Sequence, residues 1–158
     1  MSHFFSEFNT IPFEGTESKN PLAYHWYDAD KLVLNRPLKD HLRFAIAYWH
    51  SLGMNGSDPF GLPTLDRPWM SGADPMVAAR DKADAAFDLF RILDLPFYTF
   101  HDRDIAPEGS DLKESLHNFQ AMVEYLAKKM KTCNTQLLWG TANLFSHPRF
   151  MSGASTNP

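Results

Sequence analysis

The sequence predicts an α/β fold built on a parallel sheet, and three observations support this prediction. Two amphipathic segments, near 75–93 and 111–131, are long enough to be helices. Each is followed by a short apolar segment with the composition of a strand, at 97–100 and 136–139. Such alternation is typical of right-handed strand–helix–strand units, in which the strands are parallel. The length of 158 residues fits one domain.

Composition excludes several classes of protein. The net charge of −4 argues against a nucleic-acid partner, which would need a basic face. No apolar run approaches the ~18–20 residues that cross a bilayer, so we expect no membrane partner. The single cysteine, Cys133, allows no internal disulfide and suits a reducing compartment. The start of the chain lacks the basic and apolar blocks of a secretory signal, so we expect a cytoplasmic protein.

Residues 1–37 show no sustained hydrophobic period and are interrupted by Pro12, Gly15, Pro21 and Pro37. We interpret them as an irregular N-terminal arm. Because the arm is rich in aromatic residues, we expect it to pack against the rest of the protein. Residues 38–158 then form the main unit, with no further boundary visible.

The first part of this unit is ambiguous. Leu38, Leu42, Ile46 and Trp49 fit a helical stripe, yet Arg43–Trp49 is equally compatible with a buried strand. The first long helix is clearer, because Asp74 is suited to cap it, Pro75 suits its first position and Pro96 prevents its continuation.

The second half of the unit repeats this alternation. The aromatic segment Phe97–Phe100 predicts a strand. Ser110 is expected to cap the second long helix, whose apolar stripe includes Leu112, Leu116, Met122 and Leu126. Gln136–Trp139 is the last predicted strand, and 140–158 is expected to be a loop.

His101 and Asp104 are the sharpest candidates for chemistry. If 97–101 is a strand, His101 stands at its carboxyl end, where α/β folds place their sites. Asp104 lies in the following loop and can turn back to accept the imidazole N–H, which leaves the other ring nitrogen free to exchange a proton. Because such a spacing occurs often by chance, most such pairs are not catalytic.

Other candidates are weaker. The seven histidines show no metal-ligand spacing. Asp102, Asp104 and Glu108 are able to hold a hard cation, although an acidic loop is more often simply solvated. If the chain stays extended after 139, one face carries Trp139, Thr141, Asn143 and Phe145, a surface that suits a sugar or a core edge.

The segment Phe97-Tyr98-Thr99-Phe100-His101-Asp102-Arg103-Asp104, followed by Pro107-Glu108-Gly109, resembles the signature around the catalytic histidine of xylose (glucose) isomerases, in particular their longer-chain class. Further stretches agree in the same order: Asn20-Pro21-Leu22-Ala23, Tyr48-Trp49-His50, Asn55-Gly56, Asp58-Pro59-Phe60-Gly61, Arg67-Pro68-Trp69, Leu137-Leu138-Trp139-Gly140-Thr141-Ala142-Asn143, Pro148-Arg149 and Thr156-Asn157-Pro158. The resemblance implies a (β/α)8 TIM barrel that interconverts aldose and ketose, D-xylose and D-xylulose, with two divalent ions, Mg, Mn or Co.

Carried over by position, the resemblance implies that His101 opens the sugar ring and that Asp104 orients it. It places Trp49, Trp139 and Phe145 in the wall of the sugar pocket with Thr141 beside them, and makes Phe60 the ring that one subunit inserts into its neighbour's site. It also implies that the first barrel strand lies within Arg43–Trp49, after a helical turn near 38–42.

A whole barrel takes about 250 residues, so the resemblance implies only a partial barrel here, with three strands and two long helices. The family's metal-binding carboxylates and its lysine belong to later strands, so we expect no metal site in this chain and weak or no isomerase activity from the chain alone. Three parallel strands leave an apolar face and two edges open, which predicts a homodimer or higher homo-oligomer. Two alternatives stay open: an oligomer that rebuilds a metal-dependent isomerase site, and a non-catalytic self-associating module.

Overall fold

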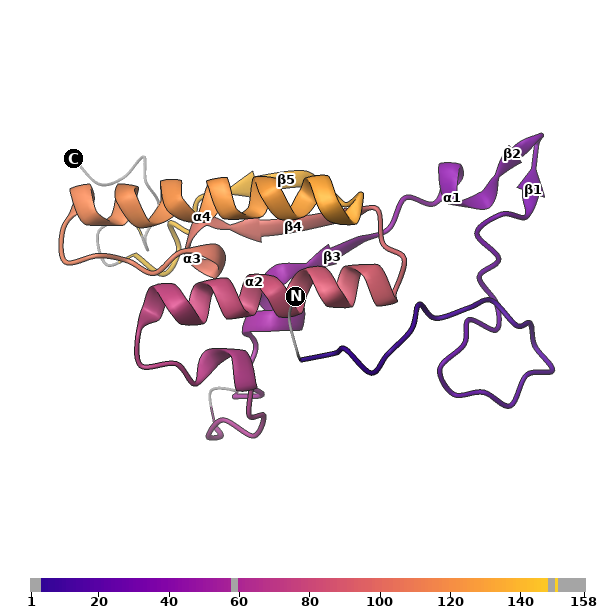
Figure 1. Ribbon diagram of the computed structural model, residues 1–158, viewed down its shortest axis with the longest axis horizontal. Helices are drawn as coiled ribbons and strands as arrows, with labels where there is room; N and C mark the ends of the chain where they lie inside the picture. Colours follow the sequence, from indigo (N-terminus) through magenta and orange to yellow (C-terminus); the bar gives the residue numbers. More distant parts are fainter. Residues whose placement is uncertain (1–3, 58–59, 148–149, 151–158) are drawn as a thin grey trace.

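A computed structural model describes residues 4–57, 60–147 and 150 (Figure 1). Its larger elements are, in chain order, strand β3 (Ala45–Ala47), helix α2 (Pro75–Ile92), strand β4 (Phe97–His101), helix α4 (Leu112–Cys133) and strand β5 (Gln136–Thr141). Three motifs of the resemblance, at Asp58-Pro59, Pro148-Arg149 and Thr156-Asn157-Pro158, lie outside the described residues.

The three main strands form one parallel sheet in the order β3-β4-β5. Helices α2 and α4 pack against each other and run along the sheet (Figure 1). The core lies between them: Tyr98 of β4 is buried, with its ring 5.4 Å from that of Phe87 and 5.3 Å from that of Phe90, both on α2. The predicted α/β fold is therefore confirmed, and its strand–helix–strand order is that of a partial (β/α)8 barrel.

Successive side chains of β4 point to opposite sides of the sheet. Tyr98 and Phe100 are buried on the helix side, so Thr99 and His101 occupy the other side. The register between β4 and β5 contains a bulge: Tyr98 pairs with Leu137, but Thr99 pairs with Trp139. The extra residue, Leu138, brings Trp139 and then Thr141 onto the same face as Thr99 and His101.

The helices begin and end close to the predicted positions, with local causes. The side chain of Asp74 accepts hydrogen bonds from the backbone N–H groups of Met76 and Val77, as predicted for a cap. The cap of α4 is Asp111, whose Oδ1 accepts from Glu114 N at 2.8 Å. The prediction of Ser110 as the cap is wrong, because its hydroxyl instead donates to the Glu114 carboxylate.

The arm contains a small hairpin that the sequence analysis did not predict. Strands β1 (Leu32–Val33) and β2 (Arg36–Pro37) are antiparallel and joined by Leu34 and Asn35, both with positive φ, as a tight hairpin turn requires. The four-residue helix α1 (Leu38–His41) follows.

The arm also contacts the main unit, as its aromatic content predicts. The hydroxyl of Tyr24 donates to the carbonyl of Leu93 at 2.8 Å. Nearer the start of the arm, the rings of Phe4 and Phe5 each lie 5.7 Å from that of Trp69, in the 3-10 helix η2 (Pro68–Met70).

The first barrel strand is shorter than the expected range Arg43–Trp49. Strand β3 covers only Ala45–Ala47, and Trp49 begins a π-helix, η1 (Trp49–Gly53). The chain turns inward here because Tyr48 and Leu52 are fully buried, and the carbonyl of Leu52 accepts the indole N–H of Trp69 at 2.9 Å.

Candidate sugar-binding site

The His101–Asp104 pair is formed at the carboxyl end of the central strand. Helix α3 (Asp102–Ile105) follows β4 directly and turns Asp104 back toward the strand. Oδ2 of Asp104 lies 3.1 Å from Nδ1 of His101 and accepts the backbone N–H of His101 at 2.7 Å. Both side chains are mostly buried, with 14% and 16% of their surfaces exposed. An ionised carboxylate only accepts, so Nδ1 carries the proton and Nε2 is left for a ligand.

Three aromatic rings surround the His101 imidazole. Ring centroids lie 4.6 Å away for Trp49, 6.0 Å for Trp139 and 5.4 Å for Phe145. Trp49 and Trp139 also contact each other at 5.6 Å. These rings come from three separate segments. Trp49 lies at the start of the π-helix η1, Trp139 lies in strand β5, and Phe145 lies in the segment that follows β5. The structure thus brings together the histidine and all three predicted wall residues.

The polar and loop candidates have different positions. Thr141 pairs with His101 in the parallel ladder and is exposed. Strand β5 runs two residues beyond its predicted end at Trp139, but the extended conformation on which a continuous face from Trp139 to Phe145 depends stops at Thr141, and a loop with a turn at 145–146 follows. Phe145 nevertheless reaches His101 through this turn. Phe60 is 98% exposed, so its insertion into a neighbouring subunit stays a prediction.

The acidic residues after β4 are used by protein donors. Oδ1 of Asp102 accepts the backbone N–H groups of Arg103 and Asn143, each at 2.8 Å. Glu108 pairs with the guanidinium of Arg103 at 2.6 Å. Across residues 4–57, 60–147 and 150, no cluster of three or more His, Cys, Asp or Glu side chains suits a metal ion. The donor set of this part of the chain therefore does not fit the metals that the resemblance implies.

Sequence reasoning missed two ionisable residues that interact electrostatically with Asp104, namely Tyr48 and Lys82. Tyr48 is fully buried, its hydroxyl has no hydrogen-bond partner among the residues that the structure describes, and burial raises the pKa of its phenol well above the usual value. The ammonium of Lys82 lies 5.8 Å from the centre of the Tyr48 ring. Burial lowers the pKa of Lys82, and the carboxylate of Asp104 opposes this effect. An amphipathic pattern places Lys82 on the polar side of α2, so the sequence gives no signal for this position.

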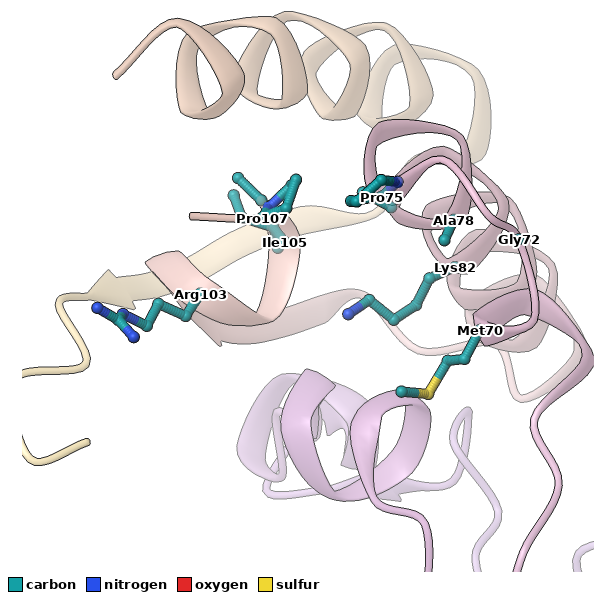
Figure 2. Close-up of a pocket in the computed structure, with 10 residues that line it drawn as sticks. Met70, Gly72, Pro75, Ala78, Lys82, Arg103, Ile105 and Pro107 are labelled. Atoms are coloured by element: carbon teal, nitrogen blue, oxygen red, sulfur yellow. The ribbon is translucent and has the colours of Figure 1, made fainter. Parts of the chain in front are cut away.

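Lys82 projects into a cavity of about 300 Å³ between α2, α3 and the η2 segment (Figure 2). Arg103 and Ile105 of α3 form another part of its lining. A larger hollow, of about 1130 Å³, lies between the arm and the amino ends of β3 and β4. Neither of these two cavities is lined by His101 or its aromatic wall.

Within the described part of the chain, no helix is long and apolar enough to cross a membrane.

Fold and site together define the class of protein: a partial (β/α)8 barrel with a histidine–carboxylate pair and an aromatic wall at the carboxyl ends of its strands. No family model matches the chain. The xylose isomerase of Photobacterium profundum is 54% identical over 158 residues, which are 100% of this chain and 36% of that protein. The xylose isomerase of Mesorhizobium japonicum is 52% identical over 160 aligned residues, covering 99% of this chain and 36% of the relative.

A third relative, the xylose isomerase of Caldicellulosiruptor bescii, is 51% identical over 154 residues, which cover 98% of this chain and 35% of the relative. The chain is similar over its whole length to xylose isomerases, as its motifs predict, and it spans about a third of the length of the curated relatives it matches.

Proposed function

We propose that this chain carries the ring-opening half of an aldose–ketose isomerase site that converts D-xylose to D-xylulose. The observation that supports this proposal is the His101–Asp104 contact at 3.1 Å inside a wall of three aromatic rings. Aromatic walls with a few polar groups are typical of small-molecule sites. The names of the relatives favour a pentose over other small polar ligands.

His101 would act as a general acid and base on the cyclic sugar. Because Asp104 holds Nδ1, Nε2 faces the ligand and can move a proton between the anomeric hydroxyl and the ring oxygen. A positioned side chain of this kind contributes about 10²–10⁴-fold to a rate. Trp49, Trp139 and Phe145 would exclude water from one side of the sugar, and Thr141 would offer a hydrogen bond at the pocket edge.

The ketose-forming step needs the two divalent ions, Mg, Mn or Co, that the resemblance implies. The described residues do not fit such ions, because the carboxylates of Asp102 and Glu108 already accept hydrogen bonds from protein donors. This chain aligns with about a third of the length of its relatives. We propose that the metal ligands and the family's lysine belong to the part of the relatives outside that third. Weak or no isomerisation is then expected of the chain alone, and a cytoplasmic location is proposed.

The test separates ring opening from isomerisation. Purified chain is added to a freshly dissolved single anomer of D-xylose, and anomer interconversion is followed by NMR without added metal. We expect faster interconversion than in buffer, lost in His101→Asn and reduced in Asp104→Ala. His50→Asn is the matched control, since His50 is exposed and its ring contacts Trp49 rather than His101. Equal rates for the chain and His101→Asn would contradict the proposal.

The same samples are assayed for xylulose with Mg²⁺ or Mn²⁺. Strong turnover that is abolished by EDTA and by His101→Ala would favour the alternative in which an oligomer rebuilds a metal site. A stable oligomer with neither activity would favour a non-catalytic module.

We further propose that copies of this chain associate as a dimer or larger oligomer. All six residues of β5 are exposed, including Leu138 at 50% and Trp139 at 42%. Open parallel edges and apolar faces of this kind are covered in stable folds. Size-exclusion chromatography with light scattering is expected to give a multiple of 18.1 kDa, and a monodisperse monomer would contradict self-association.

A further inference from the structure

The segment after β5 is joined to the start of α3 by one carboxylate. Oδ1 of Asp102 accepts the backbone N–H of Arg103, within its own helix, and the backbone N–H of Asn143, 41 residues later, both at 2.8 Å. Asp102 itself is half-buried. A longer contact, 3.9 Å from His147 Nε2 to Glu108 Oε1, also joins the segment after β5 to the loop that follows α3.

Asn143 is also hydrogen-bonded within the turn that contains Phe145. Its side-chain Oδ1 accepts the backbone N–H of Ser146 at 3.2 Å and the Ser146 hydroxyl at 2.8 Å. A turn closed in this way fixes the backbone on both sides of Phe145. The direction of the Phe145 side chain therefore depends on where Asn143 is held.

Phe145 has little packing of its own. Its side chain is 66% exposed, yet its ring stands edge-on to His101 at 5.4 Å with an interplanar angle of 88°. An exposed ring on a loop loses rotamer freedom when it is confined to one position. Something other than burial must confine it, and the hydrogen bond from Asn143 N–H to Asp102 connects its loop to the helix following His101.

We propose that Asp102 is a positioning residue of the sugar site: its carboxylate latches Asn143 to α3 and thereby holds the Phe145 ring against His101. This role rests on the proposed sugar-binding function of that ring. Asp102 acts through Asn143 and touches no reacting atom. The role accounts for the different partners of the two carboxylates: Asp102 accepts from the backbone of Arg103 and Asn143, whereas Asp104 contacts the imidazole of His101.

The latch is tested directly by NMR on the chain. In Asp102→Ala we expect the Asn143 amide to exchange at least tenfold faster. The His101 ring protons should shift in the same direction as in Phe145→Leu, because both variants remove the ring current of Phe145. Amides of α2 and α4 should keep their protection, which shows that the fold is intact. Asp102→Asn retains an acceptor oxygen and is expected to restore both signals.

A second pair covers the case in which Asp102→Ala does not fold. Asn143→Pro removes the donated N–H but leaves the carboxylate, whereas Asn143→Ala keeps the N–H and removes only the side chain. We expect the His101 ring protons to move further in the proline variant. Wild-type shifts in Asp102→Ala and in Asn143→Pro would overturn the latch, as would an Asp102→Asn variant that behaves like Asp102→Ala.

The sugar assay gives a separate readout. Loss of the latch should raise the xylose concentration needed for half-maximal anomer interconversion several-fold, with a smaller change in the rate at saturation, because Phe145 forms wall and not proton-transfer machinery. If the unmodified chain does not accelerate interconversion at all, the proposed function fails, while the exchange and ring-shift results still decide whether Asp102 is a latch.

Discussion

Gly140 is expected to control how closely β5 approaches β4. A Cβ atom at this position would lie 3.0 Å and 3.1 Å from two ring atoms of Phe100, which is buried and cannot easily move. Overpacking of this kind costs about 1–3 kcal/mol. Alanine also lowers the conformational entropy of the unfolded chain, which stabilises the folded state by about 0.4–1 kcal/mol where the backbone conformation is compatible. For Gly140→Ala we therefore expect a net loss of about 1–2 kcal/mol in the free energy of unfolding.

Urea unfolding followed by circular dichroism measures this loss. Gly72→Ala is the matched control, because a Cβ there would meet its nearest atoms at 3.6 Å, an ordinary contact. Since Trp139 and Thr141 flank Gly140, the variant should also move Trp139 relative to Trp49 and alter the tryptophan fluorescence. If Gly140→Ala is as stable as Gly72→Ala, then the close approach of β4 and β5 does not require a glycine at position 140.

Three further changes test the helices and the buried ionisable groups. Asp74→Ala removes the cap of α2 and should cost about 1 kcal/mol in urea unfolding, whereas the mid-helix Asp88→Ala should change little. Burial lowers the pKa of Lys82, so between that lowered pKa and the ordinary one the unfolded chain binds more protons than the folded chain. The free energy of unfolding should therefore rise with pH over this range. Lys82→Met should flatten this rise and raise the melting temperature at pH 7. Burial raises the pKa of Tyr98 to about 12, so above pH 10 the unfolded phenol loses its proton first; stability should fall between pH 10 and 12, and less steeply in Tyr98→Phe. An unchanged pH profile in either variant would contradict the corresponding assignment.

The long helices and the central strand could be predicted because their causes are local. The cap at Asp74, the proline at its N1 position and the apolar spacing of α2 all lie within a few residues of one another. The His101–Asp104 contact was predictable for the same reason, as it joins residues three apart at the end of a strand. The wall positions came instead from the family resemblance.

What the sequence could not predict depends on distant packing. The π-helix at Trp49 exists because Tyr48 and Leu52 are buried under other segments, and no period of five residues marks it. The bulge at Leu138 is visible only when β5 is paired with β4. The Asp102–Asn143 bond joins the start of α3 to a loop 41 residues later, and from sequence Asp102 resembles any other acidic loop residue.

The predicted apolar stripe of α4 is buried over only part of its length. Met122 and Leu126 are buried, but Leu112 is 74% and Leu116 59% exposed. Hydrophobic period identifies the helix, yet it says nothing about how much of that helix has a neighbour. Near its C-terminal half, α4 contacts α2 through the hydroxyl of Tyr125, which donates to Asp84 at 2.6 Å. The first turns of α4, which contain Leu112 and Leu116, lie beyond that contact.

Strand β4 links the core to the site through its alternation. Tyr98 packs against the rings of Phe87 and Phe90, and Phe100 contacts the position of Gly140. These contacts fix the rotation of the strand about its own axis, and a strand whose rotation is fixed must aim its intervening residues the other way. Thr99 and His101 are therefore directed by aromatic packing that they do not touch. A cavity made at Tyr98 would loosen the direction of His101 as well as the core, which is why the site depends on the helix side of the sheet as much as on its own ring wall.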